Sequence, residues 1–356
     1  MIRKRSLEEV EYASGFCFAC GRNNPIGLKL KFTYDGAKVN SEFTPQQVHE
    51  GWHGFAHGGI LYTLLDEANA HAILCHGINC VTGTSEVKFR HPAPTGETIQ
   101  ISAQLIRKTH RAAETKGTLT LKDGTIIAEN TSLFYIVGKT RISIIWDMDG
   151  VLVDSARFHF AAWQEVFSRR GVKFTEKDFI KLFGSRNDFI VRSVLGQDIP
   201  EEDIKTITRE KELEFRNTIK GKAKLLPGVS RLLDMMKGNL KMALASSAPK
   251  ENIDLISSEL HIEEYFNCVV SGHEVAESKP SPEIFSLAAK KLETNPRNCL
   301  VIEDSPLGVK AAKAAGMKCL AVSHSHPQQD IIEASAVVNT LEDIDLLSLL
   351  KIVWES

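Results

Sequence analysis

The stretch from Ile144 to Ser155, IIWDMDGVLVDS, places two carboxylates, Asp147 and Asp149, two residues apart after an apolar run. An apolar run that no polar residue interrupts is typical of a strand buried on both faces of a parallel sheet. The run therefore predicts a strand over residues 142–146, with Asp147 at its C-terminal end, where open α/β sheets bind ligands. About 140 residues precede this strand, enough for a domain of their own.

The residues after 139 repeat this pattern of short buried runs, each followed by a helix. Further runs cover residues 242–245, 268–271, 300–302 and 319–322. Such alternation predicts a parallel sheet with helices on both faces. Residues from about 155 to 222 have helical patterns but no buried run, which predicts a helical cap inserted into a second domain of residues 140–356.

The first 139 residues have a different rhythm. Apolar residues alternate over 28–34 and 38–43, and further extended segments lie near 81–90, 97–107, 110–121 and 125–137. Residues 58–74 instead carry apolar side chains at helical spacing, namely Ile60, Leu61, Leu64, Leu65, Ala68 and Ala72. One helix beside five or six antiparallel strands predicts an α+β domain over residues 1–139.

The composition excludes several classes of protein. The 356 residues are 43% hydrophobic and 25% charged, with a formal charge of −2, which leaves no basic face for nucleic acid. No apolar run approaches the roughly 20 residues of a membrane span, and no secretory core follows the basic residues Met1 to Arg5. We therefore expect a cytoplasmic protein.

The cysteines fit the same expectation. Seven cysteines, an odd number spread over the whole chain, favour reduced thiols in a chain without an export signal. Cys17 and Cys20 form a CxxC, but no second pair and no HxxxH follows nearby to complete a zinc site. A packed turn is therefore favoured over a metal site at this pair.

Polar residues follow the later buried runs of the second domain: Ser246 after 242–245, and Glu303 and Asp304 after 300–302. The stretches DMDGVLVDS, ALASS, SKPSPEIF (with Lys279) and VIEDSPLGVKAAKAAGM resemble, in this order, the four motifs of the haloacid dehalogenase superfamily of phosphohydrolases. DMDGVLVDSARFHFAAW is most similar to the β-phosphoglucomutase-like branch, whose members carry a helical cap. The resemblance implies a Rossmann-like domain over about 215 residues.

The resemblance also implies roles for these residues. Asp147 would be the nucleophile that forms an aspartyl-phosphate, and Asp149 the general acid and base. Ser246 and Lys279 would hold the phosphoryl oxygens. Mg²⁺ would bind Asp147, the backbone carbonyl of Asp149 and Asp304, while Glu303 would orient its water shell.

Cap residues decide the substrate. His159 and Trp163 match the mutase-like branch, although both could equally be packing residues of the first cap helix. Arg186, in a predicted cap loop at Ser185-Arg186-Asn187-Asp188, and Ser247 would bind substrate. The mutases' lysine and asparagine pair has no clean match in residues 209–212. We therefore expect a phosphatase for a small phosphorylated metabolite such as a sugar phosphate, with a phosphomutase as the alternative.

The start of the helix at Gly58 points to a second site. Two glycines open it in EGWHGFAHGG, and a helix N-terminus of this kind offers free N–H groups to an oxyanion. Asp66 lies inside the otherwise apolar helix, where burying a carboxylate costs free energy and therefore suggests a chemical role. HGGILYTLLDEA, together with CFACGRNNPIGLKLKF, resembles the hotdog-fold acyl-CoA thioesterases of the phenylacetate-pathway type over roughly residues 12–138.

This second resemblance implies that Gly58 supplies the oxyanion N–H, with Gly59 beside it and His57 shaping the turn. Asp66 would be nucleophile or general base, and Thr82 would assist the attacking water. Some relatives carry an amide side chain where this chain has Gly51, and three nearby residues are candidates to replace it: His49, Glu50 and His53. Glu67 is expected to be solvated or to support its neighbour.

The family's site is shared between subunits, so a homodimer or higher homo-oligomer that binds an acyl-CoA thioester is implied. An inactive domain, kept for dimerisation or acyl binding, is the alternative. Together the two resemblances predict a bifunctional hydrolase.

Overall fold

The computed structural model describes residues 15–139, 142–182 and 186–354. The chain forms two compact units, which are described separately. Unit 1 takes in the described residues up to 139 and those from 345 onward, and unit 2 takes in residues 142–344. No described helix is both long enough and apolar enough to cross a membrane.

Unit 1 is built on a six-stranded antiparallel sheet with the strand order β1-β2-β6-β7-β8-β5. Its strands are β1 (Thr33–Tyr34), β2 (Val39–Phe43), β5 (Ile78–Phe89), β6 (Ile99–Lys108), β7 (Ala112–Thr120) and β8 (Ile126–Lys139). A separate small hairpin pairs β3 (Glu50–Trp52) with β4 (Phe55–Ala56). Five of the predicted strands are present, whereas the strand predicted over residues 28–34 is reduced to Thr33–Tyr34. The hairpin is an addition to the prediction.

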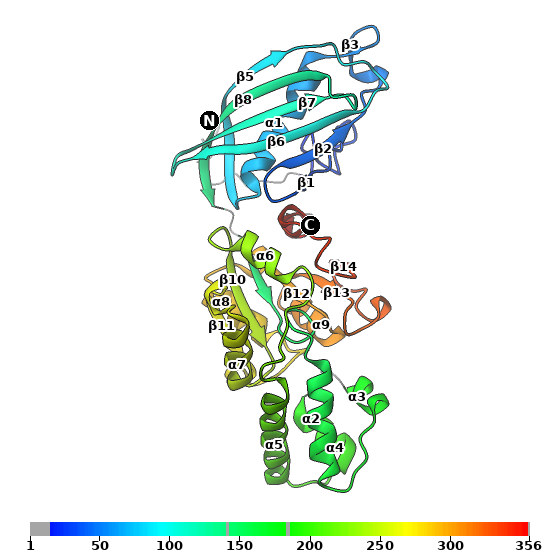
Figure 1. Ribbon diagram of the computed structural model, residues 1–356, viewed down its shortest axis with the longest axis vertical. Coiled ribbons are helices and arrows are strands. Elements are labelled where there is room, and N and C mark those ends of the chain that lie inside the picture. Colours follow the sequence, from blue (N-terminus) through cyan, green and yellow to red (C-terminus); the bar gives the residue numbers. More distant parts are fainter. Residues whose placement is uncertain (1–14, 140–141, 183–185, 355–356) are drawn as a thin grey trace, which may run out of the picture. The chain divides into compact units, whose positions relative to one another are not determined.

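The helix α1 (Gly58–Leu74) lies against this sheet and contacts β2 and β5 to β8 (Figure 1). It covers the predicted range because its apolar residues recur at helical spacing and bury one face, including Leu64, Leu65 and Ala68. Asn69 is also fully buried, and its side-chain amide donates to Asn130 Oδ1 of β8 at 2.8 Å. This hydrogen bond fixes the helix in one position on the sheet.

The last helix, α10 (Leu346–Trp354), also belongs to unit 1. Asp345 Oδ2 accepts a hydrogen bond from the backbone N–H of Tyr34 at 2.8 Å, and Lys351 Nζ donates to the carbonyl of Phe32 at 3.2 Å. The division therefore differs from the predicted one, in which every residue after 139 lay in the second domain. The helix is strongly apolar, and its leucines are buried.

Unit 2 is built on a six-stranded parallel sheet with the strand order β11-β10-β9-β12-β13-β14. The strands are β9 (Ser143–Trp146), β10 (Lys241–Ser246), β11 (Cys268–Ser271), β12 (Cys299–Glu303), β13 (Lys318–Val322) and β14 (Ala336–Val338). The helices that connect them are α6 (Val229–Met236), α7 (Lys250–Leu260), α8 (Glu283–Lys291) and α9 (Pro306–Ala314). The first five strands occupy the predicted buried runs.

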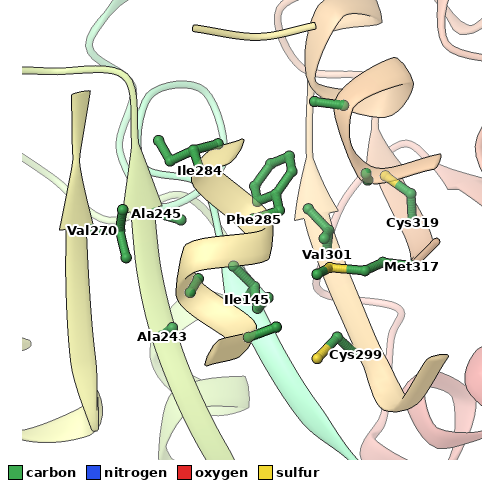
Figure 2. Packing of buried hydrophobic residues seen from close by; sticks show 14 of the residues in the cluster. Ile145, Ala243, Ala245, Val270, Ile284, Phe285, Cys299, Val301, Met317 and Cys319 are labelled. Atoms are coloured by element: carbon green, nitrogen blue, oxygen red, sulfur yellow. The ribbon is translucent and has the colours of Figure 1, made fainter. Parts of the chain in front are cut away.

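The core of unit 2 lies between this sheet and its helices. Figure 2 shows Phe285 of α8 with Ile145, Ala243 and Val301 from three neighbouring strands, all of them buried. Burying such side chains stabilises the fold by about 25 cal/mol for each Å² of apolar surface. The strands can be apolar throughout because both faces of the sheet are covered.

Between β9 and α6, the described part of the chain forms four helices: α2 (Ala156–Ser168), α3 (Glu176–Leu182), α4 (Asn187–Leu195) and α5 (Glu201–Ile219). α5 contacts both α2 and α4 (Figure 1). The helices share an apolar cluster that includes Trp163, Phe167, Phe174 and Ile204. This helical segment therefore has a core of its own.

Candidate active sites

The strand ends of unit 2 bring the predicted phosphatase residues together. β9 is paired with β10 on one side and β12 on the other, so Asp147, Ser246 and Glu303 lie at adjacent strand ends. The backbone N–H of Asp147 donates to the carbonyl of Ile302 at 3.0 Å, which holds the first residue after β9 against β12. This is the edge at which open α/β sheets bind ligands.

Lys279 is the cation at the centre of this site. Its Nζ lies 2.6 Å from Asp147 Oδ1 and 2.6 Å from Glu303 Oε1, and its side chain is only 8% exposed. The ammonium group of Lys279 donates to both buried carboxylates. Such charge-assisted hydrogen bonds are stronger than those between neutral groups. Lys279 therefore holds Asp147 in place and keeps it apart from Glu303.

Glu303 is fixed by its own neighbours. Its Oε2 accepts hydrogen bonds from the backbone N–H groups of Asp304 and Ser305, both at 2.7 Å. Ser305 in turn caps α9 by accepting from the backbone N–H of Gly308. The start of the helix thus orients the carboxylate, which then faces Lys279.

Three buried carboxylates, Asp147, Glu303 and Asp304, place oxygens within 4.8 Å of one another. Gly150 allows this close approach, since it has φ of +79° and a Cβ there would lie 1.9 Å from Asp304 Oδ2. Asp304 Oδ2 is buried and has no described hydrogen-bond partner of good geometry. Hard oxygen ligands of this kind suit a divalent cation such as Mg²⁺.

The pKa values of Asp147 and Asp304 also support a cation site at these carboxylates. Burial, together with the charges of Glu303 and Asp149, raises the pKa of Asp147 to about 8 against the opposing effect of Lys279. Burial and the charges of Glu303 and Asp147 also raise the pKa of Asp304. A bound cation would reverse this effect and keep both carboxylates ionised.

A chain of hydrogen bonds connects Asp149 to the helical segment. His159 Nε2 of α2 lies 3.3 Å from Asp149 Oδ1, and Lys211 Nζ of α5 lies 3.0 Å from His159 Nδ1. An ammonium can only donate, so Nδ1 must accept and Nε2–H must donate to Asp149. Burial and the charge of Lys211 lower the pKa of His159, which favours this neutral tautomer.

Asp149 is held as a carboxylate in this arrangement. Burial acts to raise the pKa of Asp149, but hydrogen bonds from His159 and Ser155 and the charge of Lys211 outweigh it and lower that pKa. His159 is itself stacked on Phe215 with 4.0 Å between ring centroids. Its ring therefore serves the site and the packing of the helical segment at once.

Lys211 is the residue that sequence reasoning missed, since residues 209–212 gave no clean match. Its side chain is 4% exposed and forms an ion pair with Glu212 at 2.9 Å. Glu212 also accepts from Asn187 at 2.7 Å and from Asn252 at 2.6 Å. The sequence could have indicated that Lys211 is buried, because it lies on the same face of α5 as the buried residues Ile204, Ile207, Phe215 and Ile219.

These groups surround a cavity of about 470 Å³ within unit 2. Its lining includes the strand-end carboxylates, Lys279 from the loop before α8, and His159, Arg186 and Lys211 from the helical segment. Arg186 is exposed and paired with Asp188, and Ser247 is exposed after β10. Trp163 lines the cavity but is 1% exposed and stacked on Phe167, so it packs as well. Ser185 lies outside the described residues.

The second predicted site lies at the start of α1 in unit 1. His57 is the N-cap residue, and its Nδ1 accepts a hydrogen bond from the backbone N–H of Gly59 at 2.9 Å. Gly58 is the first residue of the helix, where an N–H has no acceptor within the helix. The turn thus uses the N–H of Gly59, while Gly58 is exposed at the start of the helix.

Asp66 lies eight residues further along α1. Thr82 Oγ1 of β5 donates to Asp66 Oδ1 at 2.9 Å. Burial raises the pKa of Asp66, partly offset by this hydrogen bond, and the charge of Glu67 acts in the same direction as burial. A carboxylate with a raised pKa is a better base than an ordinary aspartate.

The position of Gly51 has a steric reason. A Cβ at residue 51 would lie 2.9 Å from the ring of His57 and 3.0 Å from its Cα. The candidates to replace an amide there have other contacts: His49 Nδ1 accepts from the backbone of Gln46, and Glu50 accepts from Thr95. His53 has a side chain that is 99% exposed.

Glu67 differs from the expectation of a solvated side chain. It is 15% exposed, and its Oε1 lies 3.3 Å from Nε2 of the buried His71. Its other oxygen lies 3.6 Å from the sulfur of Cys17. Glu67 therefore faces a different group of residues from Asp66.

Two sequence families match the chain. Residues 144–322 match the model of the haloacid dehalogenase-like hydrolases, and residues 53–128 match that of the thioesterase superfamily. β-Phosphoglucomutase from Bacillus subtilis is 32% identical over 221 residues, which cover 60% of this chain and 95% of the relative. The phosphorylated carbohydrates phosphatase from Thermotoga maritima is 32% identical over 216 residues, which cover 59% of this chain and 98% of the relative.

A solved structure is similar as well. β-Phosphoglucomutase from Clostridium difficile matches with a TM-score of 0.55 and 27% sequence identity, over 60% of this chain and 97% of that chain. The matched share of this chain is about the same as for the two relatives found by sequence.

Proposed function

The chain belongs to the haloacid dehalogenase-like hydrolases, and we propose that its second unit is a phosphatase for phosphate monoesters of small sugars. One observation carries the proposal: Lys279 holds Asp147 at 2.6 Å beside two further buried carboxylates. This arrangement provides a positioned nucleophile and a place for a cation. The names of the two curated relatives support a phosphorylated sugar as substrate.

In this proposal, Asp147 attacks the phosphorus atom with the carboxylate oxygen that Lys279 does not hold. A bond forms from Asp147 to phosphorus as the bond from phosphorus to the sugar oxygen breaks. Ser246 and Lys279 bind the phosphoryl oxygens. Asp147, the carbonyl of Asp149 and Asp304 would hold Mg²⁺, which would supply positive charge to offset the phosphate's negative charge.

Asp149 is the proton donor and acceptor of the cycle. An entering phosphate places negative charge beside Asp149, which raises the pKa of its carboxyl and favours the protonated form that the leaving oxygen needs. After the sugar leaves, Asp149 as a carboxylate takes a proton from the water that attacks the aspartyl-phosphate. His159 and Ser155, which donate to Asp149, stabilise that second form.

The helical segment acts as the cap in this proposal, and Glu212 favours a phosphatase over a phosphomutase. A mutase must hold a second phosphate of a bisphosphate in the cap. Glu212 lies 2.9 Å from Lys211 and offsets its charge, so the pair attracts a second phosphate weakly. The phosphomutase remains the second candidate because Lys211 contacts His159, a residue that matches the mutase-like branch.

Lys211→Met is expected to lower kcat of the phosphatase by about 100-fold, the scale of acid–base effects. The ammonium that fixes the tautomer of His159 is lost, so Asp149 loses its oriented donor. Phosphate release over a range of pH values tests this, because a change of tautomer also alters the pH profile.

The control for this change is the double variant Lys211→Met/Glu212→Gln. The single variant leaves Glu212 as an unpaired buried charge, which can cost about 3–5 kcal/mol of stability. The double variant removes both charges and should unfold close to the wild-type temperature while keeping the kinetic defect. Normal kinetics in the double variant would mean that Lys211 has only a structural role.

We further propose that unit 1 hydrolyses an acyl-CoA thioester. Gly58 would donate its N–H to the developing oxyanion, and Asp66 would act as nucleophile or as general base for the attacking water. The two residues are separated by about 12 Å along the helix, and the Gly58 N–H points along the helix axis away from Asp66. One thioester can therefore meet both groups only if a second copy of the chain supplies one of them.

Asp66 must be ionised to act, so thioester hydrolysis should rise with pH through the raised pKa of its carboxyl. Thr82→Val removes a hydrogen bond that lowers this pKa. The acid limb of the pH profile should then move to higher pH, and the rate at neutral pH should fall by about tenfold. An acid limb at the same pH in both proteins would exclude Asp66 as the titrating base.

The alternative for unit 1 is an acyl-binding or dimerising module without activity. Measurable thioester hydrolysis that Asp66→Ala abolishes excludes it. A wild-type protein that binds acyl-CoA but releases no CoA would instead support it.

A further inference from the structure

The loop that precedes the sheet of unit 1 brings two thiols together. The backbone N–H of Gly21 donates to the carbonyl of Cys17 at 2.9 Å, which closes a tight turn over residues 17–21. Gly21 must be glycine here, because a Cβ would lie 2.4 Å from the backbone nitrogen of Cys17. The turn therefore presents both sulfurs on one side.

The helix α1 supplies a third group to the same place. The Cys17 sulfur lies 3.6 Å from Glu67 Oε2, and the two sulfurs and a carboxylate oxygen of Glu67 lie within 4.8 Å of one another. Asp66, the preceding residue, instead contacts Thr82. Consecutive helix residues differ in direction by about 100°, so these two carboxylates serve separate sites.

The separation between the Cys17 sulfur and Glu67 suits a tetrahedral zinc site. Zinc binds sulfur at about 2.3 Å and carboxylate oxygen at about 2.0 Å, which sets a tetrahedral sulfur–oxygen separation of about 3.5 Å. The observed separation of 3.6 Å is close to this value. Thiolate ligands favour zinc over Mg²⁺ and Ca²⁺, which prefer oxygen.

The surroundings of Glu67 support a ligand role. Its Oε1 lies 3.3 Å from Nε2 of His71, which is 2% exposed and stacked on Phe32 at 4.2 Å between ring centroids. Carboxylates that bind a metal are commonly oriented by a partner of this kind. The sequence pattern did not show this group, since Glu67 follows Cys20 by 47 positions and reaches it only through the fold.

We propose that Cys17, Cys20 and Glu67 bind a zinc ion, which fastens the loop over residues 17–21 to α1. Three protein ligands leave the fourth tetrahedral position to water or to a further ligand. Binding releases the thiol protons, so the ion is held by two thiolates and one carboxylate.

The full-length protein, prepared in reducing buffer without chelator, provides the test. Zinc content measured by plasma mass spectrometry should be about one ion per chain attributable to this group. Titration of the metal-free protein with Co²⁺ should give thiolate-to-cobalt charge-transfer absorption and strong tetrahedral d–d bands. The carboxylate cluster of unit 2 has no thiolate, so it cannot produce the charge-transfer band.

Variants assign the ligands. Cys17→Ser and Cys20→Ser should lose the charge-transfer band and the zinc, whereas Cys80→Ser, a matched thiol on β5 outside the group, should keep both. Glu67→Gln should keep the thiolate band and shift the d–d bands. A reduced wild-type protein without the cobalt band overturns the proposal, and so does a metal-free Cys17–Cys20 disulfide in the protein as isolated. An unchanged spectrum in Glu67→Gln removes Glu67 from the ligand set.

Discussion

Asp147→Asn is expected to lower phosphatase turnover by about 10⁴-fold or more, the scale seen when a nucleophile is removed. The amide has nearly the same shape but carries no negative charge with which to attack phosphorus. Lys279 keeps its second partner, Glu303, at 2.6 Å, so the change leaves no unpaired buried ammonium. Phosphate release from a sugar phosphate with excess Mg²⁺ measures the loss.

Thioester hydrolysis by the same variant is the internal control and should be unchanged, since Asp147 lies in the other unit. Thermal unfolding should confirm that the variant folds. Phosphatase turnover within tenfold of the wild type would mean that another residue is the nucleophile. A loss of both activities in a folded variant would instead contradict the independence of the two sites.

Gly58→Pro is expected to lower thioester hydrolysis by about 100- to 1000-fold, the usual loss when one oxyanion donor is removed. Proline lacks the N–H but is tolerated at the first position of a helix. The preceding residue, His57, already has the extended conformation that proline requires, with φ −64° and ψ 137°. A Cβ at this position meets Phe89 at an ordinary 3.7 Å.

Gly58→Ala is the matched control, because it adds the Cβ but keeps the N–H. It should retain most of the activity. Equal losses in the alanine and proline variants would mean that the side-chain volume matters and that the N–H does not.

The same variant tests whether the site is shared between two copies. Gly58→Pro and Asp66→Ala chains, co-expressed with different affinity tags and purified through both, give mixed dimers with one intact and one doubly damaged site. Mixed dimers should recover about half of the wild-type thioesterase activity, since a two-fold axis relates the sites. Mixed dimers as inactive as both parents would place the whole site within one chain.

The buried strands of unit 2 could be predicted because each is an unbroken apolar run, and α1 because its apolar residues keep helical spacing. β14 has only three residues, Ala336–Val338, and is too short to give a pattern. The position of α10 depends on Tyr34 and Phe32, more than 300 residues earlier in the chain, and no local signal carries that contact.

Some residues of the candidate sites could also be predicted from the sequence, and others could not. Asp147 and Glu303 could be named from sequence because parallel strands place their ends side by side, and Lys279 because it stands in the motif SKPSPEIF. Lys211 could not be assigned, since its role depends on how the helical segment packs against His159. Glu67 could not be joined to Cys17 and Cys20, because only the packing of the loop on α1 brings the three together.

The most direct test of the proposed phosphatase is phosphorus NMR of the purified protein with Mg²⁺ and a panel of hexose and pentose monophosphates. We predict that at least one ester signal is replaced by that of inorganic phosphate, and that a chelator prevents the change. An isomeric sugar phosphate formed only with a bisphosphate activator would contradict the phosphatase and establish a phosphomutase. No change in any ester would contradict the proposed substrate class.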